Sequence, residues 1–239
     1  MLYLSRLILD TRSRVAQRDL ADCNRLHTRI MAALPSAPDR ATAREHFGVL
    51  YRLEQLDDPA RARLLVQSNH APDWSGLPAG YLAPPIDERG NPAVRPIDSD
   101  LGRIRQGMRL RFRLRANPTK RISKLDSEQD PRWHGKRVEL RRLDDQIAWL
   151  ERKAGAGGFA LLGVQLPGAQ APDVRVTEAP KQYGRRDDAR INFGVALFEG
   201  QIEVVDAARF NETLRAGIGS AKAYGFGLLS VALLAGGGA

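Results

Sequence analysis

The sequence predicts an α+β protein with antiparallel sheets, in which the order strand, helix, strand, strand occurs twice along 239 residues. Each half opens with a strand pattern and continues with an amphipathic helix. Between the halves, six of the fourteen prolines fall between residues 72 and 96, so this stretch cannot be a long helix or a central strand. These three observations divide the chain into two α+β units.

The first half is predicted to hold three strands and one helix. The helix is indicated by Leu26, Ile30 and Leu34, which recur at i, i+4 and i+8, and Pro35 ends it. The expected elements are a strand over Leu2–Leu9, a helix over 17–34, and strands over Phe47–Leu53 and Arg63–Gln67.

The second half begins with Met108–Arg115, where apolar and basic residues alternate strictly. This period is typical of a strand with one buried face, and it places a row of arginines on the other, exposed face. The remaining expected elements are a helix over Asp144–Lys153, strands over Phe159–Leu166, Asp173–Thr177, Ile191–Phe198 and Gln201–Val205, a basic loop over Lys181–Arg186, a helix over Ala207–Ala216 and a strand over Leu228–Leu234.

Two such units predict two tandem ferredoxin-like (RRM-like) domains. We expect an N-terminal domain over 1–98, in which 72–98 is a proline-rich linker, and a C-terminal domain over 99–239. The RNA-recognition motif shares this scaffold, but the sequence has no RNP1-type aromatic motif, so the fold by itself assigns no function.

The composition excludes several classes of protein. A single cysteine, Cys23, excludes an internal disulfide and a cysteine-rich zinc site. No apolar run approaches the ~20 residues of a membrane span, and the N-terminus lacks the basic start and cleavage site of a signal peptide. We therefore expect a cytoplasmic protein.

The net charge of +9 is concentrated in one part of the chain. Residues 101–142 hold fourteen Lys and Arg against four acidic residues, a local balance of 14 − 4 = +10. Such a segment is typical of a protein with a polyanionic partner, because each neutralised phosphate releases condensed counterions. The alternative is a solvated basic surface without a partner.

The most unusual local sequence is the glycine-rich stretch Gly217–Gly227, with Lys222 near its middle. Glycines allow positive φ angles, and successive N–H groups in such a loop can surround an anion. A plain turn before the last strand is the alternative. The Gly-Lys-Ser/Thr ending of a Walker A loop is absent, so no nucleotide cofactor is expected.

His27 is the candidate for acid–base chemistry. It lies at the edge of the apolar stripe of the first helix, and an imidazole with a pKa near ~6.5 is suited to proton transfer at neutral pH. A packed, hydrogen-bonded helix histidine is the alternative. Cys23 and His27 are spaced as two metal ligands could be, but no second pair exists, so neither a metal site nor any cofactor is expected.

Four segments, taken with the opening strand and the Asp19–His27 helix, resemble the CasE endoribonuclease family of the type I-E CRISPR Cascade complex. The resemblance runs in order from residue 1 to about 232 and is weakest over 72–105 and 165–190. The four segments are Leu110–Pro118, Ile147–Lys153, Leu197–Gly200 and Gly217–Ser230.

The resemblance implies a metal-independent nuclease that cuts CRISPR precursor RNA at the 3′ base of each repeat hairpin. Such enzymes leave a 5′-OH and a 2′,3′-cyclic phosphate and stay bound to the product with the other Cascade subunits. The catalytic histidine of the family falls on His27. Members often carry a tyrosine three residues earlier, where this chain has Asn24, which cannot transfer a proton.

The expected RNA-binding residues come from several parts of the chain. The resemblance suggests Arg152 and Lys153 as stem-binding residues, and each basic residue is, singly, as readily a solvated charge as a contact. The other candidates are Arg113 and Arg115 on the strand face, Lys120 beyond the end of that strand, Lys181, Arg185 and Arg186 in the basic loop, and Gly217, Gly219, Lys222, Gly225 and Gly227 in the glycine-rich stretch.

Three functions remain open, and the endoribonuclease is favoured. A non-catalytic RNA-hairpin-binding subunit on the same scaffold is the first alternative, and Asn24 supports it. A basic structural protein, such as one associated with the ribosome, needs only the charge and leaves the glycine-rich stretch unexplained.

Overall fold

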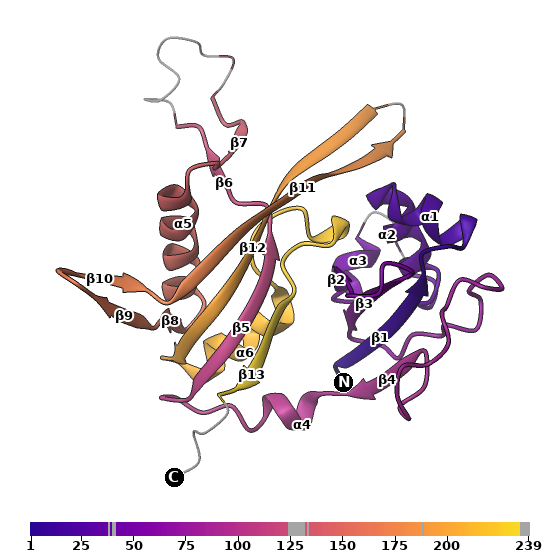
Figure 1. Ribbon diagram of the computed structural model, residues 1–239, viewed down its shortest axis with the longest axis horizontal. Helices are drawn as coiled ribbons and strands as arrows, with labels where there is room; N and C mark the ends of the chain where they lie inside the picture. Colours follow the sequence, from indigo (N-terminus) through magenta and orange to yellow (C-terminus); the bar gives the residue numbers. More distant parts are fainter. Residues whose placement is uncertain (38, 40–41, 124–131, 133, 188, 235–239) are drawn as a thin grey trace.

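The computed structural model describes residues 1–37, 39, 42–123, 132, 134–187 and 189–234. It confirms the α+β class with antiparallel sheets: two main sheets lie one in each half of the chain, with helices packed against them (Figure 1). No helix in the described part of the chain is long and apolar enough to cross a membrane.

The first sheet has the order β2-β3-β1-β4, and every neighbouring pair is antiparallel. Its strands are β1 (Tyr3–Asp10), β2 (Leu50–Gln55), β3 (Arg61–Ser68) and β4 (Ala93–Pro96). Leu7 and Leu9 of β1 point into a core that Leu26 and Ile30 complete. The alternation of buried side chains along β1 and β3 explains why both were predictable.

The single helix expected over 17–34 is two helices, α1 (Arg14–Leu20) and α2 (Cys23–Met31). Asp22 separates them, because its extended backbone ends one helix while its carboxylate accepts bonds from the N–H groups of Asn24 and Arg25 and starts the next. A short helix, α3 (Ala43–His46), was not expected.

The proline-rich stretch is more than the linker that its composition predicts. Trp74 and Tyr81 are buried in the first core, and the indole N–H of Trp74 donates to Ser5 Oγ at 3.1 Å. The stretch also supplies β4, which pairs with β1 at the edge of the sheet, the position where a strand tolerates proline. A short helix, α4 (Asp98–Leu101), follows.

The second sheet is built around β5 and has the order β11-β12-β5-β13, with β8 also paired to β12. Two helices pack on one face of it and share its core through Trp149, Leu150, Phe210 and Leu214. The elements are β5 (Arg109–Ala116), α5 (Leu143–Ala156), β8 (Phe159–Leu161), β11 (Val174–Arg186), β12 (Ala189–Val204), α6 (Ala207–Ala216) and β13 (Leu229–Leu233).

Two expectations for β11 and β12 were wrong. The basic segment Lys181–Arg186 is not a loop but the end of β11, which continues past a register shift between Ala179 and Gln182. The two strands expected on either side of Gly200 are one strand, β12. Gly200 does not turn the chain there: a Cβ at this position would overlap Asp173 O of the neighbouring strand, so the glycine allows close approach.

The expected strand over Phe159–Leu166 is divided into β8 and β9 (Gly163–Leu166), and β9 forms a separate hairpin with β10 (Ala169–Pro172). A further small pair, β6 (Thr119–Arg121) with β7 (Arg137–Glu139), projects beside the start of α5 (Figure 1). These short strand pairs lie outside the two main cores. Because neither face of such a pair is deeply buried, its sequence shows little hydrophobic period from which the strands could be predicted.

Candidate active site

His27 lies on α2, half-buried, on the side that faces the second half of the chain. Its Nδ1 is buried and has no hydrogen-bond partner among the described residues. Burial and, to a smaller extent, the positive charge of Arg44 together lower the pKa of His27 to about 4. The imidazole is therefore neutral at pH 7 and able to accept a proton.

The glycine-rich stretch forms a closed loop between α6 and β13. Gly217, Gly219, Gly225 and Gly227 all have φ between 72° and 88°, which side chains other than glycine rarely adopt. The loop is closed where Ile218 N donates to Gly227 O at 2.9 Å. Its tip is a short 3-10 turn, η3 (Lys222–Tyr224), and Figure 1 shows this yellow loop reaching toward the first half of the chain.

Tyr224 at the tip of the loop meets His27. Their ring centroids are 6.4 Å apart in an edge-to-face arrangement, and the Tyr224 ring also stacks on Phe193 of β12 at 5.0 Å. The Tyr51 hydroxyl, buried on β2, donates to Ala223 O at 3.0 Å and lies 3.4 Å from Cys23 O. Tyr51 thereby joins the loop to α2 and fixes the distance between the two rings.

Cations surround this meeting point. Lys222 donates from Nζ to Ala216 O at 2.7 Å, and its pKa is lowered by burial, by Arg44 and by Lys153, with Glu45 acting in the opposite direction. Arg44 on α3 also donates to Glu45 Oε1 at 3.0 Å. Three cations against one carboxylate leave excess positive charge beside His27, as the binding of a phosphate requires.

Two of the four arginines of β5, Arg113 and Arg115, are less exposed than the alternating pattern predicts. Arg115 is half-buried, stacks over the ring of Phe226 at 4.6 Å and donates to Gly225 O at 3.1 Å. Burial lowers the pKa of Arg115 to about 10. Arg113 is paired with Glu199 and Glu54. Both arginines hold the fold together here, and an RNA-binding role for them stays a prediction.

The remaining predicted RNA-binding residues lie on exposed positions of several elements. Figure 1 shows the β11–β12 hairpin extending over α1 and α2. Arg185 N donates to Asp22 Oδ1 at 3.4 Å, and Gly184 packs against Cys23, so the basic end of the hairpin lies at the start of α2. The exposed residues are Lys120 on β6, Arg152 and Lys153 on α5, and Lys181, Arg185 and Arg186 on β11.

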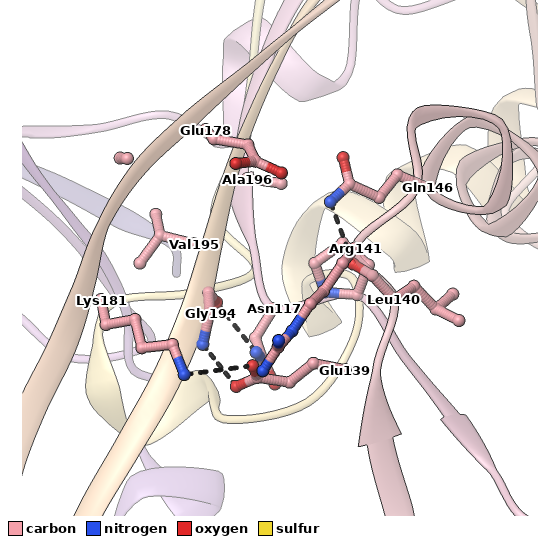
Figure 2. A pocket seen from close by; sticks show the side chains of 12 residues that line it. Asn117, Glu139, Leu140, Arg141, Gln146, Glu178, Lys181, Gly194, Val195 and Ala196 are labelled. Carbon is pink, nitrogen blue, oxygen red and sulfur yellow. Dashed lines mark hydrogen bonds and ion pairs between the residues drawn. The ribbon is translucent and has the colours of Figure 1, made fainter.

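A pocket of about 350 Å³ opens between β7, the start of α5 and the β11–β12 pair. Figure 2 shows Lys181 pointing toward Glu139, 3.9 Å away, while Glu139 also accepts a bond from Gly194 N at 2.6 Å. None of its lining residues belongs to α2, α3 or the glycine-rich loop. The pocket is therefore separate from the surroundings of His27.

Among the described residues, no group of three or more His, Cys, Asp or Glu side chains lies close enough together to hold a metal ion. Cys23 is buried, and burial followed by the charge of Asp22 raises its pKa to about 11. A thiol with so high a pKa is a poor nucleophile and a poor ligand at neutral pH.

Sequence reasoning missed Arg44, Tyr51 and Tyr224 in this site. Tyr224 lies inside the glycine-rich stretch, but the sequence suggests only the glycines and the lysine of that stretch as candidates. Arg44 and Tyr51 carry no local signal, because their importance comes from contacts with residues more than fifteen positions away.

A two-sheet α+β fold with a histidine facing a cationic glycine-rich loop defines an acid–base site suited to a phosphate ester. A model of the family described as CRISPR associated protein matches residues 2–232, and the chain belongs to this family. It is 38% identical, over 97% of its length and 100% of the relative, to the CRISPR-associated endoribonuclease Cse3 of Thermus thermophilus.

Two further comparisons agree. The Cascade subunit CasE of Escherichia coli is 29% identical, over 98% of this chain and 100% of that protein. A structure of Cse3 bound to a 19-nucleotide RNA superposes with a TM-score of 0.77 at 36% identity, covering 96% of this chain and 99% of that one. The resemblance noted in the sequence is thereby confirmed.

Proposed function

We propose that this protein is a metal-independent endoribonuclease that cleaves CRISPR precursor RNA at the 3′ base of the repeat hairpin and stays bound to the product within Cascade. The observation that carries the proposal is the half-buried His27, whose ring meets Tyr224 of the glycine-rich loop and which lies near the charges of Arg44 and Lys222. The 38% identity to an endoribonuclease supports the same conclusion.

The proposed reaction is a transesterification within the RNA chain. The ribose 2′-OH gives up its proton and attacks the adjacent phosphorus, while the bond to the 5′-oxygen breaks and that oxygen takes up a proton. The products are a 2′,3′-cyclic phosphate and a 5′-OH. Neutral His27 is suited to accept the 2′-OH proton, and Lys222, Arg44 and Lys153 would neutralise the charge that develops on the phosphorane.

The fold supports the two-domain assignment, with units over 1–98 and 99–239. Taking β5, β8, β12 and β13 as the four strands of the second unit, the spatial order is second, third, first, fourth, the same as in the first sheet. This shared order favours two ferredoxin-like domains in tandem. The exposed basic residues on β6, α5 and β11 then form the candidate surface for the RNA stem.

Cleavage in excess EDTA tests the proposal. Wild type, His27→Ala and the control Thr28→Ala, an exposed neighbour on the same helix, are each incubated with a hairpin repeat RNA recovered with the protein. We expect a product with a cyclic phosphate from wild type and the control, bound but intact RNA with His27→Ala, and no cleavage of RNA lacking the scissile 2′-OH. A requirement for Mg²⁺ would overturn the proposal.

Asn24 favours a second function, a non-catalytic RNA-binding subunit. This residue lies on α2 one turn before His27, where its amide cannot transfer protons. Tight, salt-sensitive binding of the hairpin with intact RNA after long incubation of the wild type would establish this function instead.

A further inference from the structure

Cleavage by 2′-OH attack needs two proton transfers, and His27 performs one of them. The inference that follows rests on the proposed function and concerns the group that performs the other. A neutral imidazole accepts the first proton, so the missing group must donate a proton to the 5′-oxygen as its bond to phosphorus breaks. That donor must be protonated at neutral pH and lie within a few ångströms of His27.

The described titratable groups that face this point can be compared one by one. Cys23 lies one turn before His27 on the same side of α2, but its thiol is fully buried against Gly184 of β11, and Tyr51 is buried with its hydroxyl committed to Ala223 O. Glu45 is paired with Arg44, and an arginine does not release its proton. Lys153 is exposed on α5, outside the loop that meets His27. Lys222 and Tyr224 remain, both on the loop.

Tyr224 has the better geometry of the two. Its ring lies edge-to-face with His27, whereas the Lys222 ammonium is turned to the end of α6, where it donates to Ala216 O. The Tyr224 ring is clamped by stacking on Phe193, and its hydroxyl has no hydrogen-bond partner within the described part of the chain. The hydroxyl is thus held in position with its proton uncommitted.

The loop holds Tyr224 in place through its neighbours on both sides. Ala223 O accepts the Tyr51 bond, and Gly225 packs on the Tyr51 ring, where a Cβ would come within 2.9 Å. Tyr224 N donates to Ala221 O at 2.8 Å. The helix that carries His27 and the loop that carries Tyr224 are therefore both held by one residue, Tyr51.

We propose that Tyr224 is the general acid of the cleavage reaction and replaces, from the glycine-rich loop, the proton-transfer group that Asn24 cannot supply. His27 Nε2 or Nδ1 takes the 2′-OH proton, the 2′-oxygen bonds to phosphorus, the P–O5′ bond breaks, and the phenol of Tyr224 protonates the departing 5′-oxygen. The phenolate then recovers a proton from solvent, and His27 releases one.

The test uses two RNA substrates that differ at one atom, with oxygen or sulfur at the scissile 5′ position. Sulfur leaves without protonation, so it removes the need for a general acid. On the oxygen substrate, single-turnover cleavage by Tyr224→Phe falls by about 10²–10³-fold. On the sulfur substrate, Tyr224→Phe cleaves within about threefold of wild type, whereas His27→Ala stays inactive on both.

The controls separate chemistry from structure. Phenylalanine keeps the stack on Phe193, so Tyr224→Phe retains wild-type RNA affinity and an unchanged unfolding midpoint. Tyr3→Phe, which removes a hydroxyl from β1 in the first sheet, leaves cleavage of both substrates unchanged. Lys222→Arg keeps the positive charge but cannot act as an acid. We expect it to cleave the oxygen substrate more slowly than wild type, and to cleave the sulfur substrate more slowly by the same factor.

Each contrary result has one meaning. Tyr224→Phe cleaving the oxygen substrate at the wild-type rate overturns the assignment, as does an equal defect on both substrates. If Lys222→Arg is slow on the oxygen substrate but cleaves the sulfur substrate at the wild-type rate, Lys222 is the general acid, and the assignment to Tyr224 is overturned. A wild type that cleaves neither substrate contradicts the proposed function itself, whereas active wild type with active Tyr224→Phe contradicts only this inference.

Discussion

The chemistry of His27 depends on its burial rather than on its residue type alone. The apolar side of α2 buries Leu26 and Ile30 in the first core and leaves His27 at the edge, covered by the tip of the glycine-rich loop. Loss of hydration and the nearby Arg44 both disfavour the charged imidazole. The same two causes leave a neutral base beside a cluster of cations.

Stability should depend on pH through His27. Because its pKa falls to about 4 in the folded protein, the unfolded chain binds the proton more readily between pH 6.5 and 4. The contribution of neutral His27 is therefore complete above pH 6.5 and is lost as the pH falls toward 4. Urea unfolding at pH 7.5 and 4.5 should show that wild type loses about 1–2 kcal/mol more than His27→Gln does.

In that comparison, the other histidines and the carboxylates titrate equally in both proteins. An equal loss in wild type and His27→Gln would mean that the imidazole is exposed and is not held neutral by the fold.

The Tyr51 hydroxyl is the residue-scale contact that joins α2 to the loop. Tyr51→Phe leaves Ala223 O without its donor in a buried position, which should cost about 1–3 kcal/mol of unfolding free energy. It should also lower kcat with little change in KM, because the rings of His27 and Tyr224 lose their fixed separation. Urea unfolding and single-turnover kinetics measure the two effects, with Tyr3→Phe on β1 as a control that changes neither.

At the scale of elements, the glycine-rich loop is a rigid structure rather than a flexible tether. Gly227 N donates to Arg115 O at 2.9 Å, and a Cβ on Gly227 would come within 2.7 Å of Ile218 O. The loop can therefore carry Tyr224 and Lys222 at fixed positions above α2. Backbone geometry of this kind needs glycine at several nearby positions, which explains the composition of the segment.

Gly227→Ala tests this rigidity. The added Cβ meets both a backbone oxygen and a φ of 88°, so we expect a loss of more than about 2 kcal/mol of unfolding free energy and a large loss of cleavage. Gly80→Ala, with φ of 71° but open space, measures backbone strain alone, at about 1–2 kcal/mol.

Gly155→Ala completes the series. Gly155 lies near the end of α5 with open space around it and no positive φ, so alanine there should be neutral or stabilise by up to about 1 kcal/mol. If all three substitutions cost the same, close packing inside the loop is not what requires glycine at 227.

The prediction of helices and strands succeeded where one face of the element is buried. It failed where a single residue suggested the wrong boundary for an element. The alternation in β5 and the stripe in α2 both record burial. Asp22 inside an apolar period hid the boundary between α1 and α2, and the strands expected on either side of Gly200 are one strand. In each case, a tertiary contact decides between two locally reasonable structures.

At the scale of the whole molecule, Arg52 holds the two halves together. It is buried on β2 and donates from Nη1 to Arg113 O, Leu228 O and Ser230 Oγ in the second half, at 3.0–3.2 Å. Its Nε donates to Glu54 Oε1 at 2.8 Å. Burial lowers the pKa of Arg52, and Glu54 opposes that effect.

Arg52→Met should therefore destabilise the protein by about 2–4 kcal/mol, because it leaves buried acceptors unpaired between the halves. Arg109→Met, which removes an exposed pair with Glu203, should change stability by less than about 1 kcal/mol. Urea unfolding compares the two. Equal small effects would show that the halves are held together mainly by apolar contacts.

Composition, hydrophobic period and motif content determined the α+β class, the main strands and helices, the basic character and the candidate His27. They also placed the chain beside its relatives, since a family resemblance is itself a property of the sequence. Each of these properties depends on residues that are close in the sequence or on which face of an element is buried. Burial of one face is visible in the sequence as a hydrophobic period.

Only the tertiary structure decided what lies around His27. Tyr224, Arg44 and Tyr51 come from three other elements, and Arg113 and Arg115 make contacts within the fold that the sequence does not show. Contacts between residues that are far apart in the sequence produce no hydrophobic period, because they depend on how the two halves of the chain pack against each other. The pKa of His27 and the geometry of its site are set by those contacts.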